Sequence, residues 1–437
     1  MAKYTSIDLF AGPGGLATGM KWAGVKALIA VEWSYWTVQT YATSHNAEIF
    51  ELAKYMDGTM ESPERFFQPS DRTLLIYGDV NLVTKEFILK ALKSRYGVET
   101  VDIVTGGAPC ESFSLAGQRK EDDNRNELYQ NVLRIARAVD SKMFLFENVE
   151  GLFSKRRYGV KGAMYESVIG HLEEQRDGEP NFKLASTDKD EVLLYAPDYG
   201  VPQERKRLFL VGINTKYPNG KFTYPEPTHG EGRKFRMLTV EDAIMDLPQV
   251  DINETADSYE PAVELTRMDE SRADFVQRMR EGLTTELYNH VPPNHTANMR
   301  LRLENIRPGE NMRTSAERLK TEGKTDIVEK VYPKVIYPQR NRKLRLDRPS
   351  YTITSHCLDE LVHPTLARGL TPREVARLQS FPDWYQFKGP QTKWHGDPQQ
   401  DQYEQVGDAI PPLLGYALGK QVAKTLLCIQ KTEKRRG

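Results

Sequence analysis

Cysteine and long apolar runs are scarce in this chain of 437 residues. The three cysteines, Cys110, Cys357 and Cys428, are odd in number and far apart, which argues against a disulfide framework and for a reducing compartment. No apolar run approaches the roughly 20 residues that span a bilayer, and no signal-type segment opens the chain. We therefore expect a cytoplasmic protein, without a membrane partner and monomeric.

A large net charge is also missing, because 60 basic and 61 acidic residues leave a formal charge of -1 at pH 7. A chain this close to neutral is not a general binder of polyanions. The charge is unevenly distributed, however. Residues 241–290 carry thirteen acidic and four basic side chains, whereas residues 299–348 carry fourteen basic and seven acidic ones. A local basic face is therefore expected.

What the chain does contain is an alternation of short β-branched, apolar runs with amphipathic stretches over its first 213 residues. This rhythm is typical of a doubly wound, mostly parallel α/β sheet. The expected strands are residues 4–10, 25–32, 74–78, 101–105, 143–146, 192–196 and 207–213. The last two are separated by a linker too short for a crossover helix, so they should form an antiparallel hairpin.

Composition divides the chain further along. After about residue 214 the sequence becomes rich in proline, glycine and charge, with few long periodic elements. Residues 410–429 then return to helical periodicity, with Pro411 and Pro412 in the first turn. We expect a catalytic and cofactor-binding domain in residues 1–224, completed by 401–437, and a smaller irregular domain in residues 225–400.

A glycine-rich turn follows the first expected strand, in Ile7-Asp8-Leu9-Phe10-Ala11-Gly12-Pro13-Gly14-Gly15. Such a turn lets a ligand approach the backbone at a helix N-terminus. Gly12, Gly14 and Ala17 also satisfy the dinucleotide fingerprint, with Glu32 about 20 residues on as the ribose-binding acid. A hydride-transferring enzyme is thus one interpretation.

Two neighbours of this turn favour a cofactor without phosphates. Asp8 would disfavour a pyrophosphate but could receive an ammonium or ribose group. Trp33, directly after Glu32, could stack on an adenine, and Asp79 could accept from the adenine amino group. This pattern suits S-adenosylmethionine, although Asp8 could merely cap a turn and Trp33 could lie in the core.

The chemical groups expected at the same edge of the sheet are Cys110 and Glu147. Cys110 follows the strand at 101–105 on a tight turn, and Glu147 with Asn148 ends the next strand. Ligands of doubly wound sheets bind at the carboxyl ends of the strands, so both groups should face one crevice. A lone cysteine is more often a buried small hydrophobe, and Glu147 alone could be a loop acid. On the expected hairpin, Arg205 and Arg207 alternate onto one face, and one guanidinium could hold Glu147.

Together with motifs further along, these residues make the chain resemble the C5-cytosine-specific DNA methyltransferase family, of the restriction-modification type, over nearly its whole length. Seven ordered blocks carry the resemblance: Asp8-Leu9-Phe10-Ala11-Gly12-Pro13-Gly14-Gly15; Gly106-Gly107-Ala108-Pro109-Cys110 with Phe113-Ser114; Glu147-Asn148-Val149; Gln203-x-Arg205-x-Arg207; Arg348-Pro349-Ser350-Tyr351-Thr352-Ile353-Thr354; Arg373-Glu374-x-Ala376-Arg377-Leu378-Gln379-x-Phe381-Pro382-Asp383; and Gly407-Asp408-Ala409-Ile410-Pro411-Pro412. The dehydrogenase interpretation explains only the first.

The resemblance implies methyl transfer from S-adenosylmethionine to C5 of a cytosine flipped out of double-stranded DNA. Cys110 would add to C6, Glu147 would interact with N3 and the exocyclic amine, and Arg205 would hold O2 and steady Glu147. The product is S-adenosylhomocysteine, and no metal is expected.

The site residues that follow form three groups. The expected catalytic residues are Cys110, Glu147, Arg205, Asn148, Arg207 and Gln203. Those expected to bind the cofactor are Asp8, Phe10, Gly12, Gly14, Gly15, Glu32, Trp33, Asp79, Val80, Pro109, Asp408 and Ala409. Those expected to contact DNA are Ser114, Arg340, Arg342, Lys343, Arg345 and Thr352, and residues 225–347 would form the target-recognition domain, with the basic side chains mainly on phosphates.

Three positions depart from the commonest family pattern: Ala108, Glu111 and Asp408. None removes a catalytic group, but Asp408 puts the cofactor geometry in doubt. A tRNA cytosine-5 methyltransferase of the same fold is the alternative, against which stands the long intervening domain. A chain of this length is expected to pair functionally with a restriction endonuclease.

Overall fold

The computed structural model describes residues 3–108, 127–258, 268–282, 286–394 and 396–436. The chain divides into two compact units. The first is Met1–Tyr195, Lys206–Glu226 and Pro412–Gly437, and the second is Ala196–Arg205 and Pro227–Pro411. Compared with the expected division, residues 196–205 and 401–411 lie in the second unit.

A nine-stranded sheet forms the centre of the first unit, in the order β10-β11-β6-β5-β1-β2-β4-β3, with β9 pairing with β11. The strands are β1 Tyr4–Leu9, β2 Val25–Glu32, β3 Ala47–Glu51, β4 Thr73–Tyr77, β5 Ile103–Gly107, β6 Met143–Asn148, β9 Phe182–Leu184, β10 Leu193–Tyr195 and β11 Lys206–Asn214. The pairings from β3 to β6 are parallel, and β11 is antiparallel to its neighbours. The predicted mostly parallel α/β fold and its terminal hairpin are confirmed.

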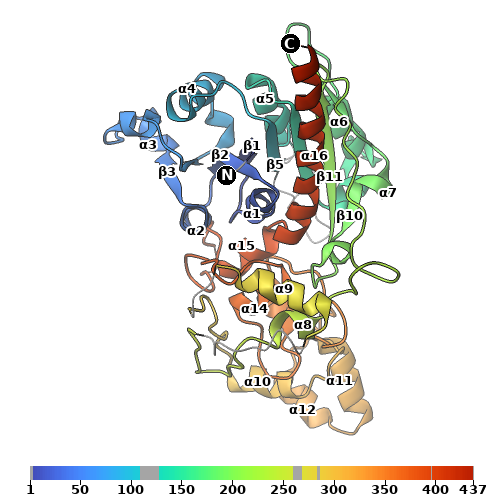
Figure 1. Ribbon diagram of the computed structural model, residues 1–437. Helices are drawn as coiled ribbons and strands as arrows, with labels where there is room; N and C mark the ends of the chain where they lie inside the picture. Colours follow the sequence, from blue (N-terminus) through green and yellow to red (C-terminus); the bar gives the residue numbers. More distant parts are fainter. Residues whose placement is uncertain (1–2, 109–126, 259–267, 283–285, 395, 437) are drawn as a thin grey trace. The chain divides into compact units, whose positions relative to one another are not determined.

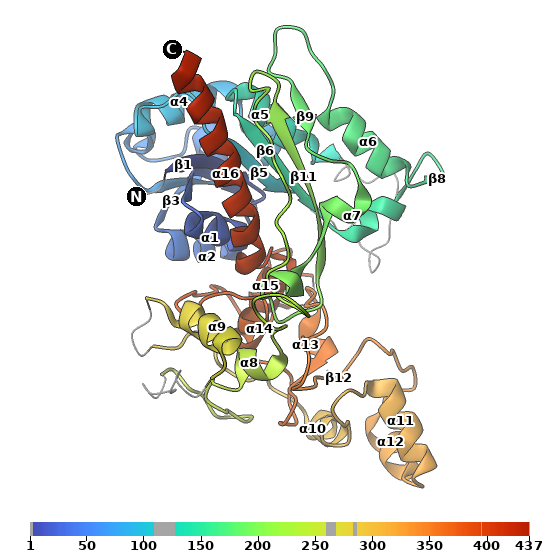
Figure 2. The same cartoon turned by 45° about the vertical axis from the view of Figure 1, so that its right-hand side comes forward.

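Helices cover this sheet on both faces: α1 Gly15–Trp22, α2 Tyr35–His45, α3 Leu52–Met56, α4 Lys85–Tyr96, α5 Gln130–Ala138, α6 Ala163–Leu172, α7 Lys189–Val192 and α16 Pro412–Arg436. The long helix α16 packs against α1 (Figure 1). A Cβ on Gly19 would lie 2.2 Å from the Pro412 carbonyl oxygen, so only glycine allows this approach. Figure 2 shows α16 crossing one face of the sheet. The expected helix near the C-terminus therefore completes the first unit.

Two strands of the nine-stranded sheet were not predicted, and one is displaced. β3 is a short edge strand in which Glu48 and Glu51 interrupt the apolar pattern, and β9 has three residues. β5 begins two residues later than expected and extends through Gly106 and Gly107. Glycine weakens a strand by itself, but here Gly106 pairs with both β1 and β6, and Gly107 pairs with β6.

The second unit consists mainly of short helices: α8 Val240–Ile244, α9 Glu270–Arg280, α10 Ala297–Glu304, α11 Met312–Thr321, α12 Thr325–Val331, α13 Cys357–Glu360, α14 Pro372–Leu378 and α15 Gln402–Asp408, with a ladder of β12 Arg342–Lys343 and β13 Leu361–Val362. Buried ion pairs tie it together. Arg368 holds Glu374 at 2.8 Å, and Arg377 holds Asp383 at 2.5 Å. Such fully paired networks favour a single arrangement of the unit. Over the described ranges, no helix is long and apolar enough to cross a membrane.

Candidate active site

The register of the sheet brings the predicted site residues of the first unit to one edge. Leu9 of β1 lies opposite Val31 of β2 and Gly106 of β5, and Gly107 lies opposite Glu147 of β6. Side chains at the carboxyl ends of these parallel strands therefore face a common region. Pro109, Cys110 and Ser114 lie outside the described residues.

The glycine turn after β1 has the backbone of a ligand cradle. Phe10, Gly12 and Gly14 all have positive φ, of 53°, 55° and 98°. A phenylalanine in the left-handed region is uncommon and marks a backbone held for function. Gly15 then begins α1, so amide N–H groups at the start of the helix surround the turn.

Two side chains that the sequence did not single out support this turn from below. The Thr18 hydroxyl donates to the Gly14 carbonyl oxygen at 2.8 Å, and His45 Nε2 lies 3.2 Å from the same oxygen. Burial lowers the pKa of His45 to about 3, so the ring is neutral. His45 thus helps to fix the backbone of Gly14. The contact depends on the position of His45 at the end of α2, which the sequence alone does not show.

Glu32 is buried at the end of β2 and braces the turn. Its carboxylate accepts hydrogen bonds from the backbone N–H groups of Gly12 at 2.9 Å, Trp33 at 2.8 Å and Ser34 at 2.9 Å. Burial nevertheless raises the pKa of Glu32 above its ordinary value. A carboxylate oxygen can accept two hydrogen bonds, and Oε2 accepts only from Gly12 among the described groups. It could therefore accept a further hydroxyl.

Asp8 is the second buried acid of this region. The Thr105 hydroxyl donates to Oδ1 at 2.8 Å, while Oδ2 is buried with no hydrogen-bond partner among the described residues. Burial, with a smaller contribution from the nearby Glu32 charge, raises the pKa of Asp8 to about 7. An arriving cation would stabilise the ionised form, whereas a pyrophosphate would meet two buried acids. The pocket chemistry therefore disfavours the dinucleotide interpretation.

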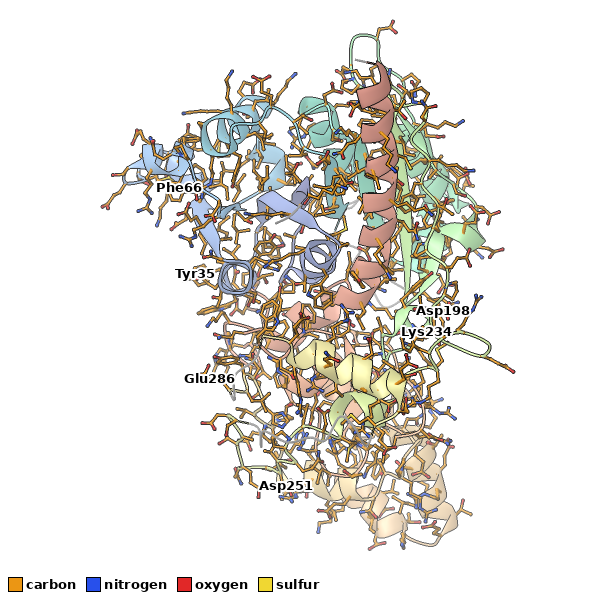
Figure 3. All side chains as sticks on the ribbon, viewed as in Figure 1. Tyr35, Phe66, Asp198, Lys234, Asp251 and Glu286 are labelled. Atoms are coloured by element: carbon orange, nitrogen blue, oxygen red, sulfur yellow. The ribbon has the colours of Figure 1, made fainter. Side chains whose placement is uncertain are left out.

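The ends of β2 and β4 carry the expected adenine site. Trp33 is 48% exposed, so it is not a core residue. Tyr35, labelled in Figure 3 at the start of α2, has its ring 6.0 Å from that of Tyr77. Asp79 is exposed and accepts from the Asn81 N–H at 2.9 Å, and Val80 beside it is buried. An exposed indole after β2 and a carboxylate after the neighbouring strand β4 are suited to a purine with an amino group.

Glu147 forms an ion pair with Arg207, with Nε to Oε1 at 3.0 Å and side chains 12% and 13% exposed. Phe209 lies directly opposite Glu147, so Arg207 is the diagonal neighbour on the same face. Gly107 makes room for the carboxylate, because a Cβ there would lie 2.5 Å from Glu147 Oε2. Asn148 is buried and accepts from the Val149 N–H at 2.9 Å, which fixes the following loop.

The sequence assigned Arg205 to steady Glu147, but the ion pair seen among the described residues is that of Glu147 with Arg207. β11 begins at Lys206, so Arg205 lies before the strand and does not alternate with Arg207 along it. The Arg205 guanidinium is fully buried in the second unit and donates to the carbonyl oxygens of Ile353 at 2.7 Å, Gly407 at 2.8 Å and Ala409 at 3.0 Å.

Gln203 supports the same backbone, because its Oε1 accepts from the Ile353 N–H at 2.9 Å. Asp408 is exposed and accepts from Gln400 Nε2 at 2.7 Å, while Ala409 is buried. The Thr352 hydroxyl donates to the Glu204 carbonyl oxygen. Arg205 and Gln203 therefore tie three of the resemblance blocks to one another within the second unit.

The basic stretch expected to contact DNA is largely paired within the second unit. Arg342 lies 3.1 Å from Glu360, and Arg345 lies 2.5 Å from Asp347. Arg340 makes a looser pair of 3.7 Å with Asp359. Lys343 is buried, which lowers the pKa of its amine. These partners would have to be exchanged for phosphates on binding.

Metal chemistry has no candidate site among the described residues, since no group of three or more His, Cys, Asp or Glu side chains could hold an ion. The groups that the described residues offer for binding and chemistry are therefore the two buried acids Asp8 and Glu32 at the glycine turn and the Glu147–Arg207 ion pair on β6 and β11.

Comparison with known proteins agrees with this geometry. The sequence model described as "C-5 cytosine-specific DNA methylase" matches residues 4–78 and 65–424. Type II methyltransferase M.DdeI of Desulfomicrobium norvegicum is 30% identical over 95% of this chain and 88% of its own length. Type II methyltransferase M.XorII of Xanthomonas oryzae is 31% identical over 98% of this chain and 86% of its own length.

Among solved structures, a prophage-encoded protein of E. coli shares the fold, with a TM-score of 0.64 at 22% identity over 97% of this chain and all of that one. The match of the family across nearly the whole chain identifies the protein: it belongs to the C-5 cytosine-specific DNA methylases and is a DNA (cytosine-5-)-methyltransferase.

Proposed function

We propose that this methyltransferase binds S-adenosylmethionine at the glycine turn and methylates a flipped cytosine held between Cys110 and the Glu147–Arg207 pair. The observation that carries the proposal is that pair, 3.0 Å across at the end of β6, with Gly107 opposite and Cys110 three residues further along the chain.

The cofactor proposal rests on the fit of the described residues. Asp8 would receive the ammonium group, Glu32 a ribose hydroxyl, Trp33 the adenine face and Asp79 the adenine amino group. When bound, S-adenosylmethionine supplies an electrophilic methyl group. Phe10, Gly12, Gly14, Gly15 and Val80 would line the same site, with Pro109, Asp408 and Ala409 as further expected contacts.

The chemistry of cytosine explains why a thiol and an acid are both needed. Aromatic C5 is a poor nucleophile, and a bond from the Cys110 thiolate to C6 makes the C5 electrons available. Glu147 hydrogen-bonds the N3 edge and the exocyclic amine, which stabilises the charge that develops on the ring. Once C5 carries the methyl group, a base removes the C5 proton. The C–H electrons re-form the double bond as the Cys110–C6 bond breaks.

The two arginines take different roles in this proposal. Arg207 holds Glu147 in place and is the guanidinium that would reach O2 of the base. Arg205, with Gln203, acts as a positioning residue through the carbonyl groups that it binds. Asn148 positions the loop after Glu147.

Double-stranded DNA is the proposed substrate, and the second unit is the proposed target-recognition domain. The C5 and C6 atoms are inaccessible in a stacked duplex, so the cytosine must leave the helix. Ser114, Thr352 and the basic stretch stay predicted DNA contacts. The names of the relatives, Type II methyltransferases, favour a functional pairing with a restriction endonuclease in the cytoplasm.

Transfer of a tritiated methyl group from S-adenosylmethionine to plasmid DNA and to total tRNA tests the proposal. We expect label in DNA, lost in Glu147→Gln. Label confined to tRNA would instead establish the tRNA alternative. The matched control is Glu150→Gln, which removes an exposed acid of the same loop that pairs with Lys206 at 3.6 Å. It should keep the activity.

A further inference from the structure

A small charged hairpin projects from the first unit shortly after β6. It consists of β7 Arg156–Arg157 and β8 Val160–Lys161, joined by Tyr158 and Gly159, and is called the basic hairpin below. The strands pair antiparallel, with Arg156 opposite Lys161 and Arg157 opposite Val160. β6 ends at Asn148 and α6 begins at Ala163, so the hairpin lies between two anchored elements.

Two features of the basic hairpin oppose its own folding. Arg156 and Lys161 place like charges directly across the ladder, an arrangement that destabilises a strand pair. Tyr158 occupies the left-handed region at φ 52°, where a two-residue turn favours asparagine or glycine. Both features lower the stability of the hairpin, and neither is needed to form the fold. Such locally unfavourable features are typical of functional segments.

The exposed groups of the hairpin are suited to a polyanion. Arg156 and Lys161 are exposed, and neither has a carboxylate partner among the residues that the structure describes. Within the described ranges, Arg156 donates only to the Gly159 carbonyl oxygen, at 2.6 Å. Tyr158 is 84% exposed and Val160 is 61% exposed. Two exposed cations and a largely exposed tyrosine thus lie together on the hairpin.

The base of the hairpin is held firmly. Arg157 forms an ion pair of 3.1 Å with Glu127, and its guanidinium lies 5.3 Å from the Tyr158 ring. The Gly162 N–H donates to the Lys155 carbonyl oxygen at 3.1 Å, which closes the hairpin. Arg157 is therefore the structural cation, while Arg156 and Lys161 are available for a ligand.

We propose that the basic hairpin is a contact for the DNA backbone beside the target cytosine, with Arg156 and Lys161 on phosphates and Tyr158 against the sugar–phosphate chain. The inference rests on the proposed function, because that function places the flipped cytosine at Glu147. Arg156 lies nine positions after Glu147, so the chain limits the distance between their Cα atoms to about 30 Å at full extension. At about 3.4 Å per base pair, the contacted phosphates lie within about one helical turn of the cytosine.

The test is the salt dependence of affinity for a fluorescein-labelled duplex of mixed sequence, because phosphate contacts do not depend on sequence. Each contact contributes about 0.9 to the slope of log affinity against log salt. The double variant Arg156→Ala/Lys161→Ala should lose about 1.8 of slope. Between about 50 and 200 mM salt, wild-type affinity should therefore fall about tenfold further than that of the variant.

The matched control removes two exposed cations of the first unit elsewhere, Lys183→Ala/Lys424→Ala. Lys183 lies on β9 opposite Ile213, whose other neighbour is Met143 at the start of β6, so it is at the opposite end of the sheet from Glu147. This control should keep the wild-type slope. A charge-conserving variant, Arg156→Lys/Lys161→Arg, should keep it as well.

Tyr158→Asn separates a binding role from a folding role. Asparagine tolerates the left-handed region, so the variant should keep or raise the Tm while its DNA affinity falls about two- to tenfold. A lowered Tm with unchanged affinity would make Tyr158 structural.

An unchanged slope in the alanine double variant, with wild-type plasmid methylation intact, would overturn the hairpin proposal alone. Absence of DNA methylation by the wild-type protein would instead overturn the proposed function. The other outcome is contact between two copies of the chain. Sedimentation velocity without DNA would then show a dimer that the double variant abolishes, which would also overturn the proposal.

Discussion

Gly107→Ala tests whether the position of Glu147 controls the chemical step. The added Cβ would lie 2.5 Å from Glu147 Oε2, whereas ordinary contact begins at 3.4 Å, so the carboxylate must move by about 0.9 Å. The atom that moves is the end of a side chain, so the cost in folding stability is small. A misplacement of about 1 Å can cost about 100-fold in rate. We expect kcat to fall by about that factor, with little change in the affinity for DNA or cofactor.

The assay is methyl transfer to plasmid DNA at saturating S-adenosylmethionine, with binding measured by fluorescence anisotropy and stability by thermal unfolding. Gly106→Ala is the matched control. Its Cβ would lie 2.8 Å from Val132 Cγ2 in the core, so it should lower Tm without moving Glu147. A kcat for Gly107→Ala within about threefold of wild type would refute the reasoning, since the geometry of Glu147 would then not limit the rate.

Three further predictions concern the cofactor site and the basic stretch. The pKa of Asp8, raised by burial from 3.8 to about 7, means that the folded state keeps a proton that the unfolded chain loses, so stability falls as the pH rises from about 4 to about 7. Asp8→Asn should lack this fall in the free energy of unfolding, which is on the order of 4 kcal/mol, and urea unfolding should show it to be more stable than wild type at pH 8. Calorimetry should show weaker binding of S-adenosylmethionine to this variant. Equal dependence of stability on pH in the two proteins would contradict this. Trp33→Ala should weaken cofactor binding by about tenfold in calorimetry, and unchanged affinity would remove Trp33 from the site. Arg342→Ala should lower the salt slope of DNA affinity by about 0.9, because binding exchanges the Glu360 partner of Arg342 for a phosphate; an unchanged slope would show that the guanidinium stays with Glu360.

The sequence predicts the first unit well, because its strands are buried on both faces and therefore read as apolar runs. Glu32 and Glu147 could be placed at strand ends for this reason. The partners of these acids could not be predicted. The sequence could not show which of Arg205 and Arg207 pairs with Glu147, because that depends on where β11 begins. β11 begins at Lys206, and a pattern of alternating side chains locates the end of a strand only to within one or two residues.

The residues that the sequence did not reveal act through the backbone or through distant contacts. His45 reaches the Gly14 carbonyl oxygen from the end of α2. Gly107 contributes by having no side chain, because a Cβ there would collide with the Glu147 carboxylate. For the basic stretch, charge composition could not show that Arg342 and Arg345 have acidic partners, and its contacts with DNA stay a prediction. The basic hairpin could have been found from the sequence, because the run Lys155-Arg156-Arg157-Tyr158-Gly159-Val160-Lys161 is rich in basic residues. Charge counted over longer segments does not show so short a run.

Covalent trapping tests the central claim most directly. In DNA whose cytosines carry fluorine at C5, the final base cannot remove the fluorine, so the bond between Cys110 and C6 should persist. After incubation with S-adenosylmethionine and plasmid DNA amplified with the fluorinated nucleotide, a denaturant-stable protein–DNA complex should form. Mass spectrometry should place the DNA on the peptide that contains Cys110, and Cys110→Ala should bind DNA without forming the complex. A stable complex attached elsewhere, or no complex with a plasmid that the enzyme methylates in its ordinary form, would contradict the account.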